Sequence, residues 1–210
     1  RVLDALDHGG DPLIANGLDG RNAFQMAAHY GRGDVLETFE QRGSKFDFSG
    51  IDAVVAACAR GRREDARRLL DGDSQLRNAW FAMSGTLLAR FAGASNDGVR
   101  TLLALGVSPN ATWMGDGYWE LAPGSTALHV AAWRANHEVV KTLIAAGTDV
   151  NARDWRDRTA LQLAVKACVD SYWKYRRRPD SVAALLAAGA AKDGIELPTG
   201  FDEIDHLLAK

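Results

Sequence analysis

Residues 124–154 read GSTALHVAAWRANHEVVKTLIAAGTDVNARD, and this stretch predicts the fold of the chain. Thr126 offers a side-chain oxygen at the point where a first helix would begin, as N-cap residues do. Apolar residues then recur at helical spacing in two short runs, which residues 134–136 separate. Gly147 follows the second run and can take the left-handed conformation that ends helices. The stretch therefore predicts two short helices, a tight turn between them and a loop after the second.

A helix pair this short cannot bury its apolar faces alone, so one copy predicts a stack of similar units. Residues able to cap a helix recur at intervals of about 30–40 residues, in the range of helical repeats. These candidate caps are Asn22, Asp52, Thr86, Thr126 and Thr159. The chain is therefore expected to be a single domain built from repeated helix pairs.

The opening Thr126-Ala127-Leu128-His129 is similar to the Thr-Pro-Leu-His opening of ankyrin repeats, with alanine in place of proline. The resemblance implies an all-α ankyrin-repeat solenoid, in which stacked helix-turn-helix units are joined by β-hairpin fingers. It also implies that His129 makes a structural hydrogen bond to neighbouring backbone and has no catalytic role. About five full repeats and partial terminal repeats are expected over residues 1–210.

The expected units differ in their loops. They are a partial N-terminal repeat at 1–19, full repeats at 20–50, 51–83, 84–123, 124–156 and 157–193, and a C-terminal capping helix at 194–210. Asp116-Gly117 is flanked by aromatic residues and is a hairpin signal, which predicts a longer finger in the third repeat. In the fifth repeat, the helical pattern continues to Pro179 and predicts a lengthened first helix.

Composition narrows the class of protein. The chain has 210 residues, 47% of them hydrophobic, and a formal net charge of −2, so it carries no bulk attraction to nucleic acid or to a membrane surface. No apolar run is long enough to span a bilayer. Cys58 and Cys168 lie inside helical patterns, as buried thiols in a reducing compartment do, so we expect a cytoplasmic location.

Signatures of catalysis and metal binding are missing from the sequence. His137-Glu138 begins like a zinc-protease helix, but Lys141 stands where the second metal ligand would be. The five histidines are dispersed through different expected elements and do not pair with the cysteines. We therefore expect neither an enzyme nor a cofactor or metal.

Binding of a protein partner is the expected function. Stacked repeats present their finger tips and first helices as one concave surface, and Trp, Tyr and Arg are the residues enriched at interface hot spots. The expected contacts are Arg21, His29, Tyr30, Trp113, Tyr118, Trp119, Trp133, Arg134, Trp155, Arg156 and Arg158.

Three alternatives remain open. The finger tryptophans could instead pack on one another within the chain. The domain could target or regulate a larger enzyme or effector protein. It could also self-associate through the face of its N-terminal repeat.

A cluster of arginines lies at residues 62–68. We interpret it mainly as a solvated helix face, and the more specific hypothesis is that it binds an acidic partner.

Overall fold

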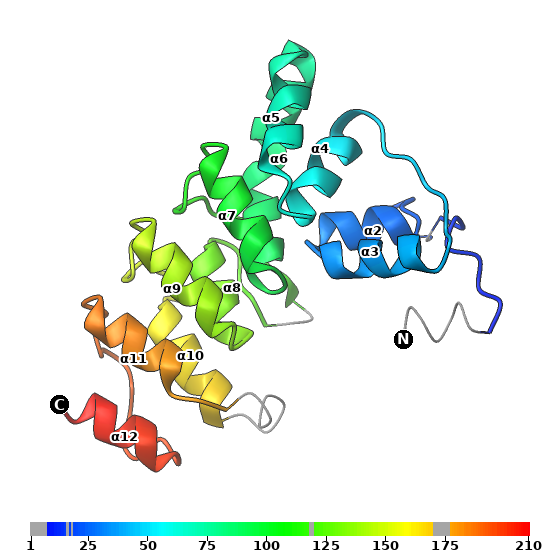
Figure 1. Cartoon of the computed structure of the whole chain (residues 1–210). Coiled ribbons are helices and arrows are strands. Elements are labelled where there is room, and N and C mark those ends of the chain that lie inside the picture. Colours follow the sequence, from blue (N-terminus) through cyan, green and yellow to red (C-terminus); the bar gives the residue numbers. More distant parts are fainter. Residues whose placement is uncertain (1–7, 16, 18, 118–119, 170–176) are drawn as a thin grey trace.

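The computed structural model describes residues 8–15, 17, 19–117, 120–169 and 177–210. Within these ranges the secondary structure consists of eleven α-helices, and the β-structure is limited to three isolated antiparallel bridges. The expected all-α class is confirmed. Helices of consecutive pairs lie side by side in a curved stack, as Figure 1 shows. None of the described helices combines the length and the apolar character needed to cross a bilayer.

The helices form two layers. Their bounds are α2 Ala23–His29, α3 Gly33–Gln41, α4 Gly50–Ala59, α5 Arg63–Asp71, α6 Ser74–Ala92, α7 Asn96–Ala104, α8 Ala127–Trp133, α9 His137–Ala145, α10 Ala160–Val169, α11 Asp180–Ala187 and α12 Asp202–Leu208. The inner layer runs through α2, α4, α6, α8 and α10, each packed on the next. In the outer layer, α7, α9 and α11 pack on one another, and α12 covers α11.

One continuous apolar core runs between the layers. The inner helices contribute small residues such as Ala131 and Ala164, and the outer helices contribute Leu143 and Leu185, all of them buried. Small residues on the inner helices let neighbouring helix pairs approach closely, so each pair buries its apolar faces against the next. Stability is therefore shared along the stack.

Three of the expected caps are confirmed. Asn22 Oδ1 accepts from the Gln25 amide at 2.9 Å, and the Gln25 side chain accepts from the Asn22 amide at 3.1 Å. Thr159 and Gln162 make the same reciprocal pair. At Thr126 the backbone is extended, and its amide donates to Nδ1 of His129 at 3.2 Å. Gly147 has φ +80° and ends α9 as expected.

Two expected caps are wrong. Asp52 lies inside the first turn of α4, because that helix begins at Gly50 after Ser49. Thr86 lies in the middle of α6, a 19-residue helix whose N-cap is Asp73. The expected boundary between residues 83 and 84 therefore falls inside a continuous helix, and the first part of α6 stands where a finger loop was expected.

The first part of α6 is fixed to α5, and we call residues 74–85 the helical arm. The guanidinium of Arg77 donates to the carbonyls of Leu70 and Asp71 at the end of α5, at 3.2–3.3 Å. Trp80, on the same part of α6, is fully buried and belongs to the apolar core. The uncapped carbonyls of α5 are thus satisfied by the arm that follows it.

Phe91 of α6 packs against two glycines, Gly31 after α2 and Gly98 on α7. A Cβ atom at Gly31 would lie 2.8 Å from the Phe91 ring, and one at Gly98 would lie 2.7 Å from it. The ring therefore fills a slot that only glycines leave open on both sides. This packing brings α6 into contact with α2, past the intervening α4.

The region expected to hold a C-terminal capping helix contains α12, which buries Ile204 and Leu208. The partial helix expected before residue 8 and the helix extension expected over residues 170–176 lie outside the described residues.

Candidate functional site

The first described finger is a hairpin between α7 and α8. Backbone bonds join Trp113 to Ser125 and Gly124 at 3.1 and 2.9 Å, and Asp116 to Leu121 at 2.7 and 3.0 Å. The expected turn at Asp116-Gly117 therefore lies at the tip of paired backbone. The hairpin is held to the start of α8 by the bridge between Thr112 and Thr126.

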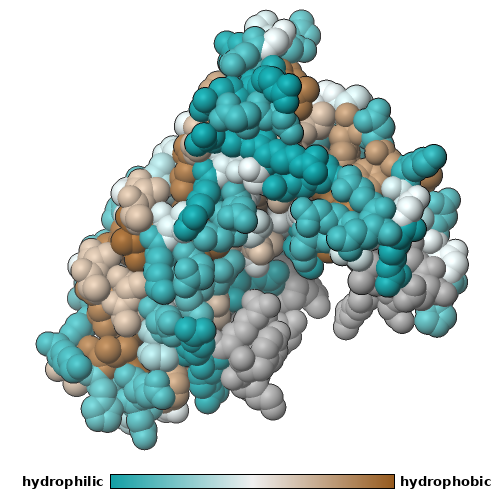
Figure 2. Space-filling model, in the orientation of Figure 1, coloured by the Kyte–Doolittle hydropathy of each residue, from teal (hydrophilic) through white to brown (hydrophobic). Residues whose placement is uncertain are grey.

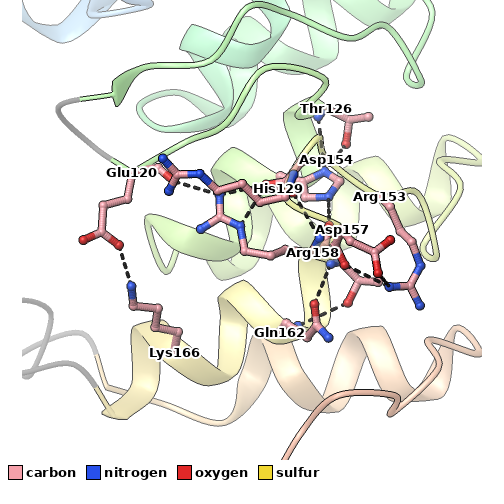
Figure 3. A network of polar contacts seen from close by, with 11 residues as sticks. Glu120, Thr126, His129, Arg153, Asp154, Asp157, Arg158, Gln162 and Lys166 are labelled. Atoms are coloured by element: carbon pink, nitrogen blue, oxygen red, sulfur yellow. Dashed lines mark hydrogen bonds and ion pairs between the residues drawn. The ribbon is translucent and has the colours of Figure 1, made fainter.

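The second finger, between α9 and α10, is organised around a buried carboxylate. Asp154 Oδ1 accepts from the amides of Arg156 and Arg158 at 2.9 and 3.0 Å, and Oδ2 accepts from the Arg158 guanidinium at 2.7 and 2.9 Å. The Asp154 side chain is 0% exposed. Although burial opposes its charged form, the hydrogen bonds and charge of Arg158 hold the pKa of Asp154 below its ordinary value. Figure 3 shows this network.

His129 connects this finger to α8. Its Nδ1 accepts from the Thr126 amide and lies 2.9 Å from Thr126 Oγ1, and its Nε2 donates to the Arg158 carbonyl at 3.0 Å. Burial lowers the pKa of His129, so the ring is neutral at neutral pH. The structural role expected for His129 is confirmed, since both ring nitrogens are occupied by neighbouring residues.

The two fingers are also joined to each other and to α10. The Arg158 guanidinium donates to the Glu120 carbonyl at 2.8 Å, and the Glu120 carboxylate pairs with Lys166 on α10. The Lys166 ammonium lies 5.2 Å from the centroid of the Trp133 ring. These contacts make the fingers and the inner helices one ordered surface (Figure 3).

Trp155 is the most prominent side chain on this surface. Its amide donates to the Pro123 carbonyl at 2.9 Å, and its indole lies against Gly124 of the preceding finger. Nevertheless 75% of the residue is exposed. The neighbouring Arg156 is also exposed and makes no ion pair with any residue that the structure describes.

Two of the expected surface positions need correction. His29 is 1% exposed, and its Nε2 donates to Asp52 Oδ1 at 2.7 Å, because it sits between α2 and α4 and not on the concave side. Trp133 is 6% exposed, because Lys166 and the neighbouring helices cover its ring. Neither side chain presents a free surface.

The other expected residues fall into three groups. Tyr30 is 43% exposed with the Arg90 guanidinium 5.0 Å from its ring centroid. Trp113 is half-buried against the core, and half-buried side chains are also found at Arg21, Arg134 and Arg158. Tyr118 and Trp119 lie outside the described residues.

Intramolecular stacking of the tryptophans is not seen among the described residues. Among the described residues, aromatic ring pairs join Phe24 to Phe39 and Phe46, and Phe46 to Phe48, and none of them includes a tryptophan. Trp155 instead packs on backbone at Gly124.

Two exposed apolar residues, on the first finger and the helical arm, were not anticipated from the sequence. Met114, on the first finger, is 72% exposed, and Phe81, on the helical arm, is 57% exposed. The hairpin signal around Asp116 could have pointed to Met114. Phe81 carries no such signal, because its position depends on α6 being continuous.

Within the described ranges no cluster of three His, Cys, Asp or Glu side chains has the arrangement of a metal site. Both cysteines are buried free thiols, and burial raises the pKa of Cys58 to about 12 and that of Cys168 to about 11.

Stacked helix pairs joined by ordered fingers define a helical-repeat solenoid. Residues 123–155 match the family model of the ankyrin repeat. These residues include the finger base at Gly124, the helices α8 and α9, and the second finger as far as Trp155. The chain thus contains an ankyrin repeat within its stack of helix pairs, and ankyrin repeats are protein-interaction modules.

Proposed function

We propose that this domain is a non-enzymatic module that binds a protein partner across its fingers and inner helices. Trp155 is the observation that carries the proposal, because a large indole that is 75% exposed would gain from being covered. Burying such a side chain at the centre of an interface contributes on the order of 2–4 kcal/mol. Met114 adds a second exposed apolar side chain on the neighbouring finger.

The surface is ordered before any partner arrives. The buried Asp154 carboxylate accepts from two backbone amides that follow Trp155, and the Trp155 amide donates to the Pro123 carbonyl. A side chain held in place in the free protein loses little conformational freedom on binding. Because Trp155 is held in place in this way, it is suited to anchor a partner protein.

Charge and further aromatic surface accompany this anchor. Arg156 offers an exposed guanidinium next to Trp155, and Tyr30 offers an exposed ring at the other end of the described stack. Arginine and tyrosine supply both apolar area and polar groups at interfaces. The proposed contact set therefore keeps Tyr30, Trp155 and Arg156 from the sequence analysis and adds Met114.

Affinity capture from native lysate tests the proposal. The parent protein is compared with the variant Trp155→Ala/Arg156→Ala and with the control Leu197→Ala, which removes a 51% exposed side chain near the C-terminal helix. We expect a protein that the parent and the control retain and that the double variant loses, with unchanged helical circular dichroism in all three. Equal capture by all three proteins would contradict the proposed surface.

A further inference from the structure

The outer face of the stack contains a second surface, formed because α5 stands apart from its neighbours. Whereas α7, α9 and α11 pack on one another, α5 packs on α4 and α6 and makes at most marginal contact with α3 and α7. The segment just before α5 lies close to the start of α7, since a Cβ atom added at Gly61 would lie 3.3 Å from Cβ of Asp97. From that point α5 and α7 diverge.

The divergence opens a groove of about 610 Å³ between α5 and α7. Four arginines line it: Arg60 at the end of α4, Arg62 and Arg63 at the start of α5, and Arg100 on α7. Figure 2, which views this face, shows a strongly hydrophilic surface over α5. A groove of this volume can accommodate a peptide segment of a few residues.

The ion pairs within the protein decide which charges remain available. Glu64 pairs with Arg63 at 3.0 Å and lies 3.9 Å from Arg67. Asp65 pairs with Arg68. These contacts neutralise the two carboxylates that α5 contributes to the groove.

Arg60 is also occupied. Its guanidinium pairs with Glu40 at 2.7 Å and lies over the rings of Phe46 and Phe48, on the side of α5 that faces α3. Arg62 and Arg100, by contrast, are exposed and make no ion pair with any described residue. Asp97 is the one lining carboxylate without such a pair in the described chain, so two cations face one anion.

We propose that this groove binds an acidic segment of a partner protein, with a partner carboxylate between Arg62 and Arg100. Charge complementarity supports this occupant, because the groove retains an excess of unpaired guanidinium groups that can each bind a carboxylate through two hydrogen bonds. The outer face is separate from the finger surface, so this inference does not depend on the proposed function.

Fluorescence anisotropy with a fluorescein-labelled peptide of alternating glutamate and alanine tests the inference. The groove variant Arg62→Glu/Arg100→Glu is compared with the control Arg42→Glu/Lys45→Glu, which makes the same change of charge at exposed positions that do not line the groove. We expect the groove variant to lose at least about tenfold in affinity, which corresponds to about 1.4 kcal/mol. The control should bind nearly as well as the parent.

Four outcomes would overturn the inference. Equal losses in both double variants would show attraction to overall charge without a site. Absence of binding at physiological ionic strength would remove the site. Equal binding of a matched lysine–alanine peptide would show that charge does not select the ligand. Tighter binding of a single-stranded oligonucleotide would assign the groove to nucleic acid. Circular dichroism of each variant checks that the helices are retained.

Discussion

The indole of Trp155 occupies the space that a side chain at residue 124 would need. A Cβ atom added to Gly124 would lie 2.5 Å from Cδ1 of Trp155, and Gly124 itself has φ +78°. The first finger thus supplies a flat backbone platform for the aromatic side chain of the second. The position of the proposed anchor depends on this glycine.

Substitution Gly124→Ala should therefore displace Trp155 and weaken partner binding. Both the steric contact and the positive φ oppose alanine at this position. The control is Gly147→Ala, because Gly147 has φ +80° but no atom within 4 Å of the added Cβ. We expect the control to lose about 1–2 kcal/mol of stability from backbone strain alone, and Gly124→Ala to lose more. Thermal unfolding measures the difference; equal losses would show that Trp155 moves away without cost.

Mild acid should destabilise the protein through two buried histidines. Burial lowers the folded-state pKa of both His29 and His129 below the ordinary value of 6.5. Between about pH 7 and about pH 5 the unfolded chain therefore binds protons at these sites before the folded chain does, and the free energy of unfolding falls as the pH falls. The full contribution is present above the unfolded pKa.

Urea unfolding at the two ends of this pH range measures the effect. The variant His129→Gln should show a smaller loss between the two pH values than the parent, because it removes one of the two titrating groups. Asp154 does not interfere, since its lowered pKa places its own loss of stability at more acidic pH. An unchanged pH dependence in the variant would show that His129 does not contribute.

Asn151 is expected to stabilise the contact between two successive loops. Its Nδ2 donates to the Gly189 carbonyl at 3.2 Å, and its Oδ1 accepts from the Ala191 amide at 2.8 Å. Replacement by alanine removes both hydrogen bonds, which lie at the surface, and should cost about 0.5–1.5 kcal/mol. Asn78→Ala, on an exposed part of α6, is the control and should change stability by less than about 0.5 kcal/mol. Similar midpoints for both variants in a denaturant titration would be inconsistent with the bridging role.

Truncation of two adjacent residues on the helical arm should cost very different amounts of stability. Trp80 is fully buried, and Trp80→Ala should destabilise the protein by about 3–5 kcal/mol. Phe81 is 57% exposed, so Phe81→Ala should cost less than about 1 kcal/mol. Chemical denaturation of the two variants compares them. Comparable losses would mean that the arm is not oriented as the structure shows.

The sequence predicts the class of fold because its signals are local. The Thr126–His129 opening, the apolar spacing of α8 and α9 and the glycine after α9 lie within one stretch, and the structure has the corresponding cap, helices and positive φ. Each of these features depends on residues a few positions apart. Local physical chemistry is enough to determine them.

The helical arm could not be predicted in the same way. Thr86 is a good capping residue, but here the helix continues through it, because Asp73 caps α6, Trp80 is buried in the core and Arg77 binds the end of α5. Tertiary packing therefore overrides a local start signal.

Exposure of the site residues was the least predictable feature. Trp133 and Trp155 carry the same side chain in the same motif, yet one is 6% exposed and the other 75%. Trp133 is buried because it belongs to the apolar core and because Lys166, 33 positions away on the next inner helix, lies over its ring. Such contacts between successive repeats do not leave a pattern in either repeat alone.

Site-specific photo-crosslinking tests the central claim, that the fingers bind a protein partner, most directly. Benzoylphenylalanine is placed at position 155, on the second finger, or at position 197, which is also exposed but lies near the C-terminal helix. After irradiation in native lysate, we predict a discrete crosslinked protein from position 155 and none from position 197. The same crosslinked protein from position 197, with none from position 155, would contradict the account.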